Sequence, residues 1–370
     1  MHPIVILGTG LAGYHLAQEI RKLDKNVPLQ LLTASDGRYY SKPVLSNALS
    51  QAPEKVGLQP VSARDMSQRL QAEIWTNTVV TDIDPAQHEV YTANQNFPYS
   101  KLILACGARP RTLPFEASVY TVNHLHEYEQ LQQALLGKQK IGILGAGLIG
   151  CEFANHLSRA GYAVDVIAPV AYPLAPLLPP QIGRVLQHSL AQQGVQWHLP
   201  NTLEKIESLP SGHQLQLLDK TLTVDLLISA IGLQPNIELA QAAGLLTNRG
   251  IVVDQYLQTS AADIYALGDC MELQGQVLQF VAPLLQGSRS LAKTLIAEPT
   301  ALQYSTMPIV LKTPDCPLVF IPPSVEGEWQ VTGEGKHLKA LFYNQHKQLR
   351  GYALTGEAVR ERSQLVLADV

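Results

Sequence analysis

The sequence contains two copies of a glycine pattern that strongly restricts how the chain can fold. Residues 8–13 (GTGLAG) and 145–150 (GAGLIG) each come directly after a short apolar run. Each is followed by a stretch with a helical pattern and then by a second apolar run. At the first turn of a βαβ unit, the glycines of G-x-G-x-x-G permit a tight turn, a close backbone approach to a pyrophosphate and close helix packing. The helix N-terminus then faces the anion. The repetition predicts two Rossmann-like units that hold two dinucleotides.

The composition excludes several classes of protein. A chain of 370 residues, 46% hydrophobic and 16% charged, has room for two or three globular domains. The net charge of −4 provides no basic surface for a nucleic acid. No apolar run reaches the roughly 18 residues that a membrane helix needs, and the N-terminus runs directly into an apolar strand. We therefore expect a cytoplasmic protein that binds neither nucleic acid nor membrane.

The four cysteines, Cys106, Cys151, Cys270 and Cys316, show no C-x-x-C or C-x₄-C spacing. The absence of such closely spaced cysteine pairs argues against a zinc site, a structural disulfide set and a redox-active dithiol. Cys151 lies inside the second glycine pattern, where a catalytic thiol is conceivable, but no resolving cysteine accompanies it. We interpret all four as buried or semi-buried thiols, and we expect no metal site.

The rest of the chain alternates apolar runs with turn signals. We predict a turn at residues 36–42, with a helix from Pro43, and a last helix at 357–366. The other expected elements are strands at 4–7, 29–33, 74–80, 88–91, 101–106, 141–144, 163–168, 226–231, 264–267, 339–343 and 349–355, and helices at 14–23 and 283–297.

Five motifs occur in an order that resembles the FAD-dependent pyridine-nucleotide reductases. They are residues 8–13, 106–108 (CGA), 145–152 (GAGLIGCE), 230–232 (AIG) and 264–269 (IYALGD). Three further stretches, residues 40–43 (YSKP), 147–155 (GLIGCEFAN) and 312–318 (KTPDCPL), are similar to bacterial NADH–rubredoxin reductases. The first resemblance extends over essentially the whole chain.

The resemblance implies an α/β fold with two Rossmann-like domains and a small α+β C-terminal domain. The expected FAD domain is discontinuous (1–109 and 234–304), the NADH domain is inserted (110–233), and residues 305–370 form the C-terminal domain. Because this last domain is short, we expect a monomer.

The resemblance also implies which residues hold the cofactors. For FAD they are the first glycine turn, the residues after two strands, a helix start and the segment around Lys42: Gly8, Gly10, Leu11, Ala12, Gly13, Lys42, Pro43, Cys106, Gly107, Arg109, Gly268, Asp269, Pro283, Leu284 and Lys312. For NADH they are Gly145, Gly147, Leu148, Ile149, Gly150, Glu152 and Gly232. Asp269 is expected to accept a hydrogen bond from a ribityl hydroxyl, and the N-terminus of the 283–297 helix is expected to face the flavin ring.

The sequence departs from the family where an acid normally binds the adenosine ribose. The first unit has Thr33 and Ser35 there, and each could donate one weaker hydrogen bond. The second unit ends at Ala168-Pro169, with neither an acid nor a basic residue before Arg184. We favour NADH over NADPH, chiefly because the resembling subfamily uses NADH.

Three residues are expected nearest the chemistry. An ammonium at Lys42 or Lys312 could stabilise electron density on the flavin as hydride arrives. Glu152 could hydrogen-bond the nicotinamide amide and pair with a lysine. The alternatives are solvated surface lysines and, for Glu152, a first-turn helix acid favoured by the macrodipole.

The resemblance implies an enzyme in which NADH delivers a hydride to FAD and single electrons pass to rubredoxin. Since a dithiol is disfavoured, electrons would leave the flavin directly. Two alternatives keep the chemistry and change the acceptor: a ferredoxin reductase of an oxygenase system, or an NADH oxidase. A third is a flavin-bound sensor or interaction protein.

Overall fold

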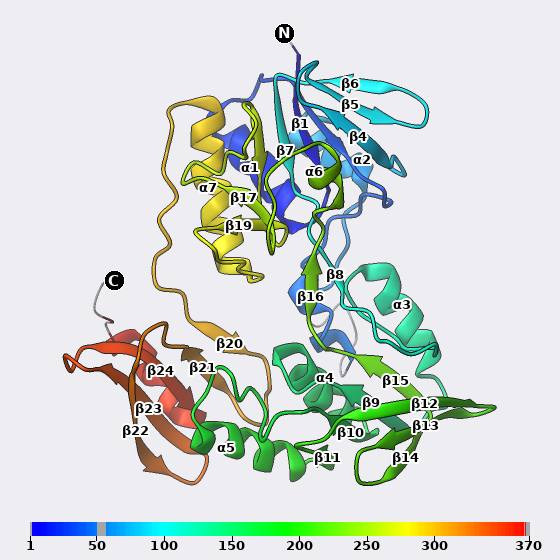
Figure 1. The fold of residues 1–370 in the computed structure, drawn as a ribbon, viewed down its shortest axis with the longest axis vertical. Coiled ribbons are helices and arrows are strands. Elements are labelled where there is room, and N and C mark those ends of the chain that lie inside the picture. The colour runs from blue at the N-terminus through cyan, green and yellow to red at the C-terminus, as the bar shows by residue number, and fades with distance from the viewer. Residues whose placement is uncertain (1, 50–56, 366, 368–370) are drawn as a thin grey trace. The chain divides into compact units, whose positions relative to one another are not determined.

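The computed structural model describes residues 2–49, 57–365 and 367. The chain divides into two compact units, each assembled from three segments. Unit 1 consists of Met1–Lys42, Leu58–Arg109 and Leu233–Ser305, and unit 2 of Pro43–Gly57, Pro110–Gly232 and Thr306–Val370. Figure 1 labels their helices and strands.

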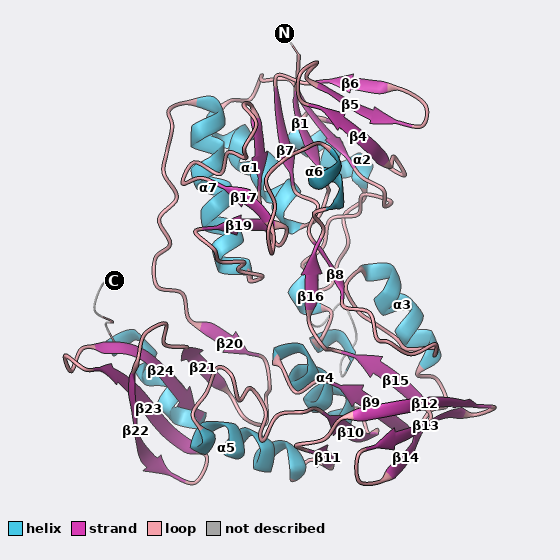
Figure 2. Cartoon of the chain, in the orientation of Figure 1, coloured by secondary structure: helices cyan, strands magenta, loops and turns pink. Residues whose placement is uncertain are grey.

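Unit 1 is organised around a parallel five-stranded sheet in the order β18-β7-β1-β2-β3. The near-continuous apolar composition of its middle strands is typical of parallel sheets covered on both faces. Helix α1 (Leu11–Leu23) packs against helix α7 (Val281–Ile296), as Figure 2 shows. The strands are β1 (Ile4–Leu7), β2 (Leu29–Leu32), β3 (Glu73–Trp75), β7 (Lys101–Leu104) and β18 (Ile264–Ala266).

Smaller elements complete unit 1. An antiparallel sheet is formed by β4 (Val80–Asp84), β5 (Glu89–Thr92) and β6 (Asn96–Pro98), and short pairs by β17 (Ile251–Val253) with β19 (Met271–Leu273) and β8 (Ala108–Pro110) with β16 (Leu233–Pro235). The remaining helices are α2 (Ala63–Leu70) and α6 (Glu238–Ala242).

The predicted strand at 74–80 is wrong. Asn77 adopts φ +50° and its N–H bonds Ser35 O at 2.8 Å, so the chain turns between β3 and β4. A side-chain amide tolerates this left-handed conformation well. As a result β3 joins the parallel sheet, and only β4 pairs with β5.

Unit 2 contains a second parallel sheet, in the order β11-β10-β9-β15. One of its faces is covered by the antiparallel sheet β12-β13-β14, whose residues share a core with Leu144, Ile167 and Leu227. The bounds are β9 (Lys140–Leu144), β10 (Ala163–Ile167), β11 (Val195–His198), β15 (Leu226–Ser229), β12 (Leu203–Leu209), β13 (Gly212–Leu217), β14 (Thr221–Val224), α3 (Leu125–Ala134), α4 (Leu148–Arg159) and α5 (Pro180–Ala191).

Unit 2 ends in an antiparallel five-stranded sheet in the order β20-β21-β24-β23-β22. The predicted last helix is a 3-10 helix, η4 (Gly356–Gln364), and its expected end at residue 366 lies outside the described residues. Among residues 42–49, the described part of the helix expected from Pro43, the chain forms two 3-10 turns, η1 (Lys42–Val44) and η2 (Asn47–Leu49). The strands are β20 (Ile309–Leu311), β21 (Leu318–Ile321), β22 (Gly327–Glu334), β23 (His337–Asn344) and β24 (Leu349–Thr355).

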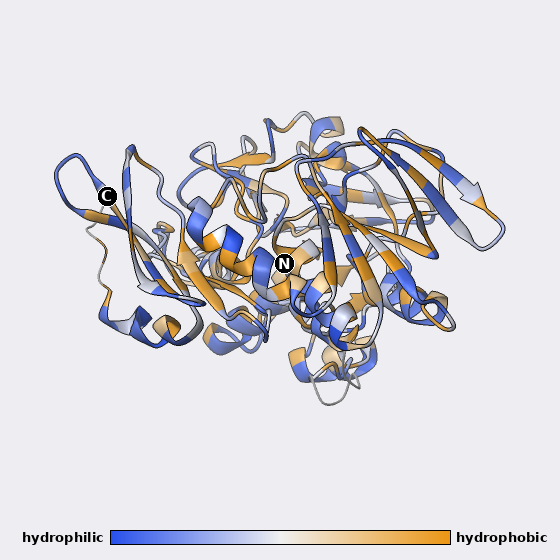
Figure 3. Ribbon diagram, turned by 90° about the horizontal axis from the view of Figure 1, so that it is seen from below, coloured by the Kyte–Doolittle hydropathy of each residue, from blue (hydrophilic) through white to orange (hydrophobic). Residues whose placement is uncertain are grey.

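Each unit has its own hydrophobic core. In Figure 3 orange stretches, which mark hydrophobic residues, run along the strands. In unit 2 a single core contains Phe153 and Leu157 of α4 together with Leu311, Phe320 and Ala353 of the C-terminal sheet. The second βαβ unit and the C-terminal sheet therefore fold around shared apolar contacts.

The predicted fold class, two Rossmann-like parallel sheets and a small α+β C-terminal part, is confirmed. The predicted domain boundaries at residues 109, 233 and 304 stay predictions. Among the described residues, no helix combines the length and the apolar character needed to cross a membrane.

Candidate functional site

The first glycine turn leaves open space above its middle glycine. Gly8 has φ +117°, and a Cβ there would lie 2.3 Å from Ala105 O; a Cβ at Gly13 would lie 1.9 Å from Gly8 O. A Cβ at Gly10 would meet nothing within 4 Å. Helix α1 begins at Leu11 with no side-chain cap and no acid in its first turn. Its first N–H groups are therefore free to bind an anion that approaches Gly10.

The second turn repeats this geometry in unit 2. A Cβ at Gly145 would lie 2.5 Å from Ala230 O and one at Gly150 2.0 Å from Gly145 O, while Gly147 again has nothing within 4 Å. Helix α4 begins at Leu148, also uncapped and without an acid in its first turn. The next residue, Ile149, is 47% exposed although it is apolar. The outer glycines serve the packing of the turn, and the middle one leaves room for a ligand.

Several predicted cofactor residues of unit 1 meet beside the first turn. A Cβ on Gly268 would lie 2.9 Å from the Cβ of Ala12 and 3.7 Å from Leu284 Cδ1. The next residue, Asp269, is partly buried, and desolvation raises the pKa of its carboxyl, against the attraction of Lys42. The structure thus places the first turn, the strand-tip acid and the start of α7 together. A carboxylate that is partly removed from water in this place is stabilised by hydrogen-bond donors.

Helix α7 begins at Val281, two residues before the sequence prediction, so Pro283 and Leu284 lie in its first turn. Its N-cap residue, Phe280, provides no side-chain hydrogen bond. Gln279 precedes it, and its buried Nε2 has no hydrogen-bond partner among the described residues. A buried amide donor without an acceptor is costly, so a bound group with a carbonyl or carboxylate oxygen would satisfy it. Sequence analysis missed this residue.

The open space at Gly10 and the unpaired Gln279 amide are observations that fit a flavin dinucleotide in unit 1. The hydroxyls of Thr33 and Ser35 lie 3.0 Å apart at the end of β2, and the Ser35 and Gly37 N–H groups bond to them at 3.3 Å. These two residues are thus arranged as one hydroxyl pair where the family has an acid.

Arg109 is held in place by two residues that the sequence analysis did not select. It forms an ion pair with Glu238 at 2.5 Å and donates to Asn236 Oδ1 at 3.2 Å. Asn236 in turn donates to Cys106 O at 2.8 Å and bonds through its N–H to Gly107 O at 3.0 Å. Asn236 therefore joins the CGA segment to the chain after β16, a contact over about 130 residues that no local pattern reveals.

In unit 2, the buried Glu152 and the partly buried Lys312 belong to one hydrogen-bond network. Glu152 is 4% exposed; its Oε2 accepts a hydrogen bond from Ser46 Oγ at 2.6 Å, and its Oε1 accepts one from the Lys312 N–H at 3.1 Å. The Lys312 ammonium donates to Pro43 O. Burial lowers the pKa of Lys312, and the charge of Glu152 opposes this shift. Because Glu152 is the fifth residue of α4, the alternative that it is a first-turn acid is wrong.

The remaining predicted residues lie as follows. Gly232 has φ +103°, and a Cβ there would approach the Arg111 side chain, whose N–H bonds Gly232 O at 3.0 Å. All four cysteines are free, and burial raises the pKa of each thiol. Cys151 donates its thiol hydrogen to Ala146 O at 3.6 Å. A protonated, buried thiol suits packing better than nucleophilic catalysis.

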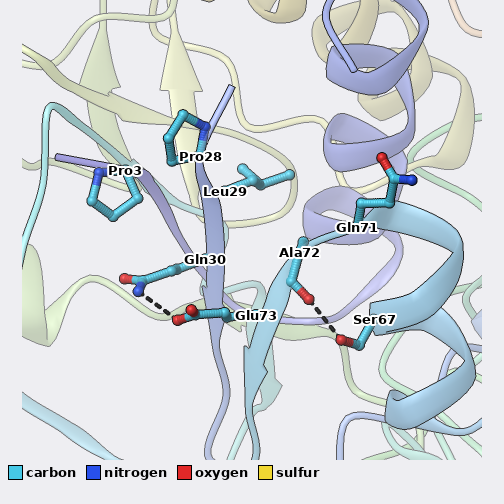
Figure 4. Close-up of a pocket in the computed structure, with 8 residues that line it drawn as sticks. All are labelled: Pro3, Pro28, Leu29, Gln30, Ser67, Gln71, Ala72 and Glu73. Carbon is cyan, nitrogen blue, oxygen red and sulfur yellow. Dashed lines mark hydrogen bonds between the residues drawn. The ribbon is translucent and has the colours of Figure 1, made fainter. Parts of the chain in front are cut away.

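A pocket of about 430 Å³ opens elsewhere in unit 1 (Figure 4). It is lined by Pro3, Leu29 and Glu73, which precede or begin β1, β2 and β3, and Gln30 donates to Glu73 across it at 2.7 Å. Ligands of open α/β sheets bind at the carboxyl ends of the strands. This pocket lies at the amino ends, so we do not assign the cofactor to it.

Residues 2–294 match the protein family described as pyridine nucleotide-disulphide oxidoreductase. The chain belongs to this family. Residues 301–368 match a second description, the rubredoxin binding C-terminal domain.

Two curated relatives extend over nearly the whole chain. A rubredoxin-NAD(+) reductase of Alcanivorax borkumensis is 44% identical, with 99% of this chain and 98% of the relative covered. One of Acinetobacter baylyi is 41% identical over 96% of this chain and 94% of the relative. Among solved structures, a ferredoxin reductase of Rhodopseudomonas palustris matches with a TM-score of 0.90 and 25% identity, over 98% of this chain and 93% of that one. The resemblance inferred from the sequence, to the superfamily and to its rubredoxin reductase branch, is confirmed.

Proposed function

We propose that the chain is a flavoprotein reductase that takes a hydride from NADH and passes single electrons to rubredoxin. The observation that carries the proposal is the repeated glycine turn, one in each unit, with the same open space over Gly10 and over Gly147. Two such turns in one chain suit two dinucleotides, and the match of residues 301–368 to a rubredoxin binding domain indicates the acceptor. FAD, when bound, supplies the chemistry that links a two-electron donor to a one-electron acceptor.

The residues of unit 1 would bind and orient FAD. The free N–H groups at the start of α1 would hold its pyrophosphate, and Asp269 would accept a hydrogen bond from a ribityl hydroxyl. The N-terminus of α7 and the Gln279 amide would donate to oxygen atoms of the ring. Thr33 and Ser35 would face the adenosine ribose.

The residues of unit 2 would hold NADH and adjust the charge around the reacting atoms. The free N–H groups at the start of α4 would bind the NADH pyrophosphate, with Ile149 and Gly232 beside it. We keep Lys42 and Lys312 as the cations that would stabilise electron density on the ring. We also keep the division into a discontinuous FAD domain, an inserted NADH domain and a C-terminal domain.

Stopped-flow absorbance tests the proposal. Mixing the FAD-loaded protein with NADH under anaerobic conditions should bleach the oxidised flavin spectrum, and added rubredoxin should restore it. The same experiment with a ferredoxin and with oxygen tests the alternative acceptors, and comparison of kcat/KM for NADH and NADPH tests the donor. If rubredoxin restores the spectrum no faster than oxygen does, the acceptor is wrong, and a colourless protein that binds no added FAD would refute the whole proposal.

A further inference from the structure

Helix α4 carries four polar side chains on one face: Glu152, Asn155, His156 and Arg159. Their spacing of three, four and seven residues places them on one side of the helix. Glu152, Asn155 and His156 are at most 4% exposed. Each of the four contacts the segment Lys312–Asp315, which follows β20 and lies about 160 residues later in the chain. Buried polar groups need hydrogen-bond partners, so the segment that these four side chains contact indicates their role.

Two of these side chains, Glu152 and His156, bind the backbone N–H and C=O of Lys312. The Lys312 N–H donates to Glu152 Oε1 at 3.1 Å, and His156 Nε2 donates to Lys312 O at 3.1 Å. A carbonyl oxygen can only accept, so His156 carries its proton on Nε2 in this contact. Glu152 and His156 lie one helical turn apart, and together they fix the backbone on both sides of the Lys312 side chain.

The second pair holds Asp315, three residues later. Asn155 Nδ2 donates to Asp315 Oδ2 at 2.5 Å, and Arg159 pairs with Asp315 Oδ1 at 3.0 Å. Asp315 lies within a closed turn, because Thr313 Oγ1 donates to Cys316 O at 2.7 Å and the Cys316 N–H donates to Thr313 O at 3.0 Å. The segment is thus fixed at both ends and across its middle.

This anchoring matters for a lysine because its long side chain has four rotatable bonds and loses much rotamer entropy when it is held in one place. A fixed backbone at Lys312 limits where its ammonium, which donates to Pro43 O, can lie. Helix α4, which carries Glu152 and His156, begins at the second glycine turn, where Gly147 leaves room for a dinucleotide. Helix α4 therefore links that turn directly to the backbone of Lys312.

We propose that His156 and Glu152 are positioning residues that hold Lys312, and that His156 acts on the reaction only through Lys312. The inference rests on the proposed function, in which the Lys312 ammonium stabilises charge on the flavin. Glu152 takes part through both carboxylate oxygens, which accept from the Ser46 hydroxyl and from the Lys312 N–H.

A double-mutant cycle on the FAD-loaded protein tests this proposal. The variants are His156→Leu, Lys312→Met and the double variant, with His156→Gln as the conservative replacement that keeps a donor. His188→Leu is the matched control, since His188 is an exposed histidine on α5 of the same unit. We expect His156→Leu to lower kcat by about 10- to 100-fold, as small displacements of a catalytic group do. KM for NADH should change less than about twofold.

We expect His156→Gln to recover most of kcat and His188→Leu to change nothing. In the Lys312→Met background, His156→Leu should have no further effect. Additive losses in the double variant, or an unchanged kcat in His156→Leu, would overturn the proposal.

Amide hydrogen exchange supplies a readout that does not depend on activity. Exchange at residues 312–316 should be faster in His156→Leu than in the parent and in the control variant. Unchanged exchange there would contradict the anchoring even if activity were lost. If the parent protein reduces no rubredoxin while exchange responds as expected, the proposed function fails and the anchoring of Lys312 stands.

Discussion

The two glycine turns allow a prediction that separates folding from binding. In each turn the middle glycine, Gly10 or Gly147, has open space, and the third, Gly13 or Gly150, packs against a backbone carbonyl. We therefore expect Gly10→Ala and Gly147→Ala to fold and lose ligand affinity, and Gly13→Ala and Gly150→Ala to lose stability. The four variants make the same chemical change, the addition of one methyl group.

The magnitudes follow from the surroundings of each Cβ. At Gly13 and Gly150 the added Cβ would lie 1.9 and 2.0 Å from a carbonyl oxygen. A flexible side chain could move away from such a contact, but a backbone carbonyl cannot. Overpacking costs about 1–3 kcal/mol even where side chains can yield, so we expect at least the upper end. Gly10 and Gly147 are N-cap residues in extended conformation. Alanine there costs about 0.5–1.5 kcal/mol as a cap and regains about 0.4–1 kcal/mol from the unfolded chain. The net effect should stay below about 1 kcal/mol.

The loss of affinity is larger than this change in stability. A methyl group over the open turn would prevent hydrogen bonds to a charged pyrophosphate, which contribute about 1.5–3 kcal/mol each. This corresponds to about a 10- to 150-fold weaker complex. Titration of FAD-free protein, followed by flavin fluorescence, measures the FAD affinity, and steady-state kinetics give KM for NADH.

Gly10→Ala should weaken FAD binding and Gly147→Ala should raise KM for NADH, with each leaving the other ligand unaffected. Thermal unfolding of the FAD-free proteins supplies the stability comparison. If Gly147→Ala loses FAD, or if Gly10→Ala binds FAD as tightly as the parent, the assignment of the two turns is wrong.

Three further predictions concern buried polar groups. Burial raises the pKa of Asp269 in the folded protein above its ordinary value of 3.8, which the unfolded chain retains. Between the unfolded and the folded pKa the folded protein binds more protons, so its stability falls as pH rises through this range. Asp269→Asn should therefore stabilise the FAD-free protein at pH 7 in thermal unfolding, progressively less as pH falls toward 3.8, and should weaken FAD binding. Gln279→Leu should stabilise the FAD-free protein by about 1–2 kcal/mol, because it removes an unpaired buried amide, and should weaken FAD binding severalfold; an unchanged FAD affinity in titration would contradict our assignment. Asp165 is 1% exposed and contacts His198 at 2.6 Å and Lys140 at 3.3 Å, so in urea unfolding Asp165→Ala should cost about 3 kcal/mol or more, and Lys140→Met, whose ammonium is partly exposed, should cost less.

The sequence predicted those parts of the structure that local patterns determine. The apolar runs before each glycine turn are strands, and the helix predicted at residues 14–23 is present but begins at Leu11. The prediction started late because Leu11 and Ala12 lie inside the glycine pattern and were counted with the turn, although both are good helix formers. The strand predicted at 74–80 is wrong because one left-handed residue, Asn77, turns the chain inside a stretch of β-branched and aromatic residues that otherwise suit a strand.

The candidate site was predicted to the extent that its members belong to motifs. Gly268, Ala12 and Leu284 belong to three motifs, and the structure brings them together. Asn236, Gln279 and His156 were missed because each acts through a partner distant in sequence or through an unpaired atom. The sequence shows only that His156 follows Glu152 by four residues, a spacing that places both on one side of a helix.

The shared core of unit 2 limits how this chain could diversify. Phe320 and Ala353 of the C-terminal sheet pack with residues of the second βαβ unit, so the sheet is not a module that could be replaced independently. Replacing it wholesale would expose the apolar flank of α4 and loosen the helix that starts at the second glycine turn. A change of the electron-acceptor protein would therefore require substitutions on the outer face of that sheet, while the core residues of its inner face stay unchanged.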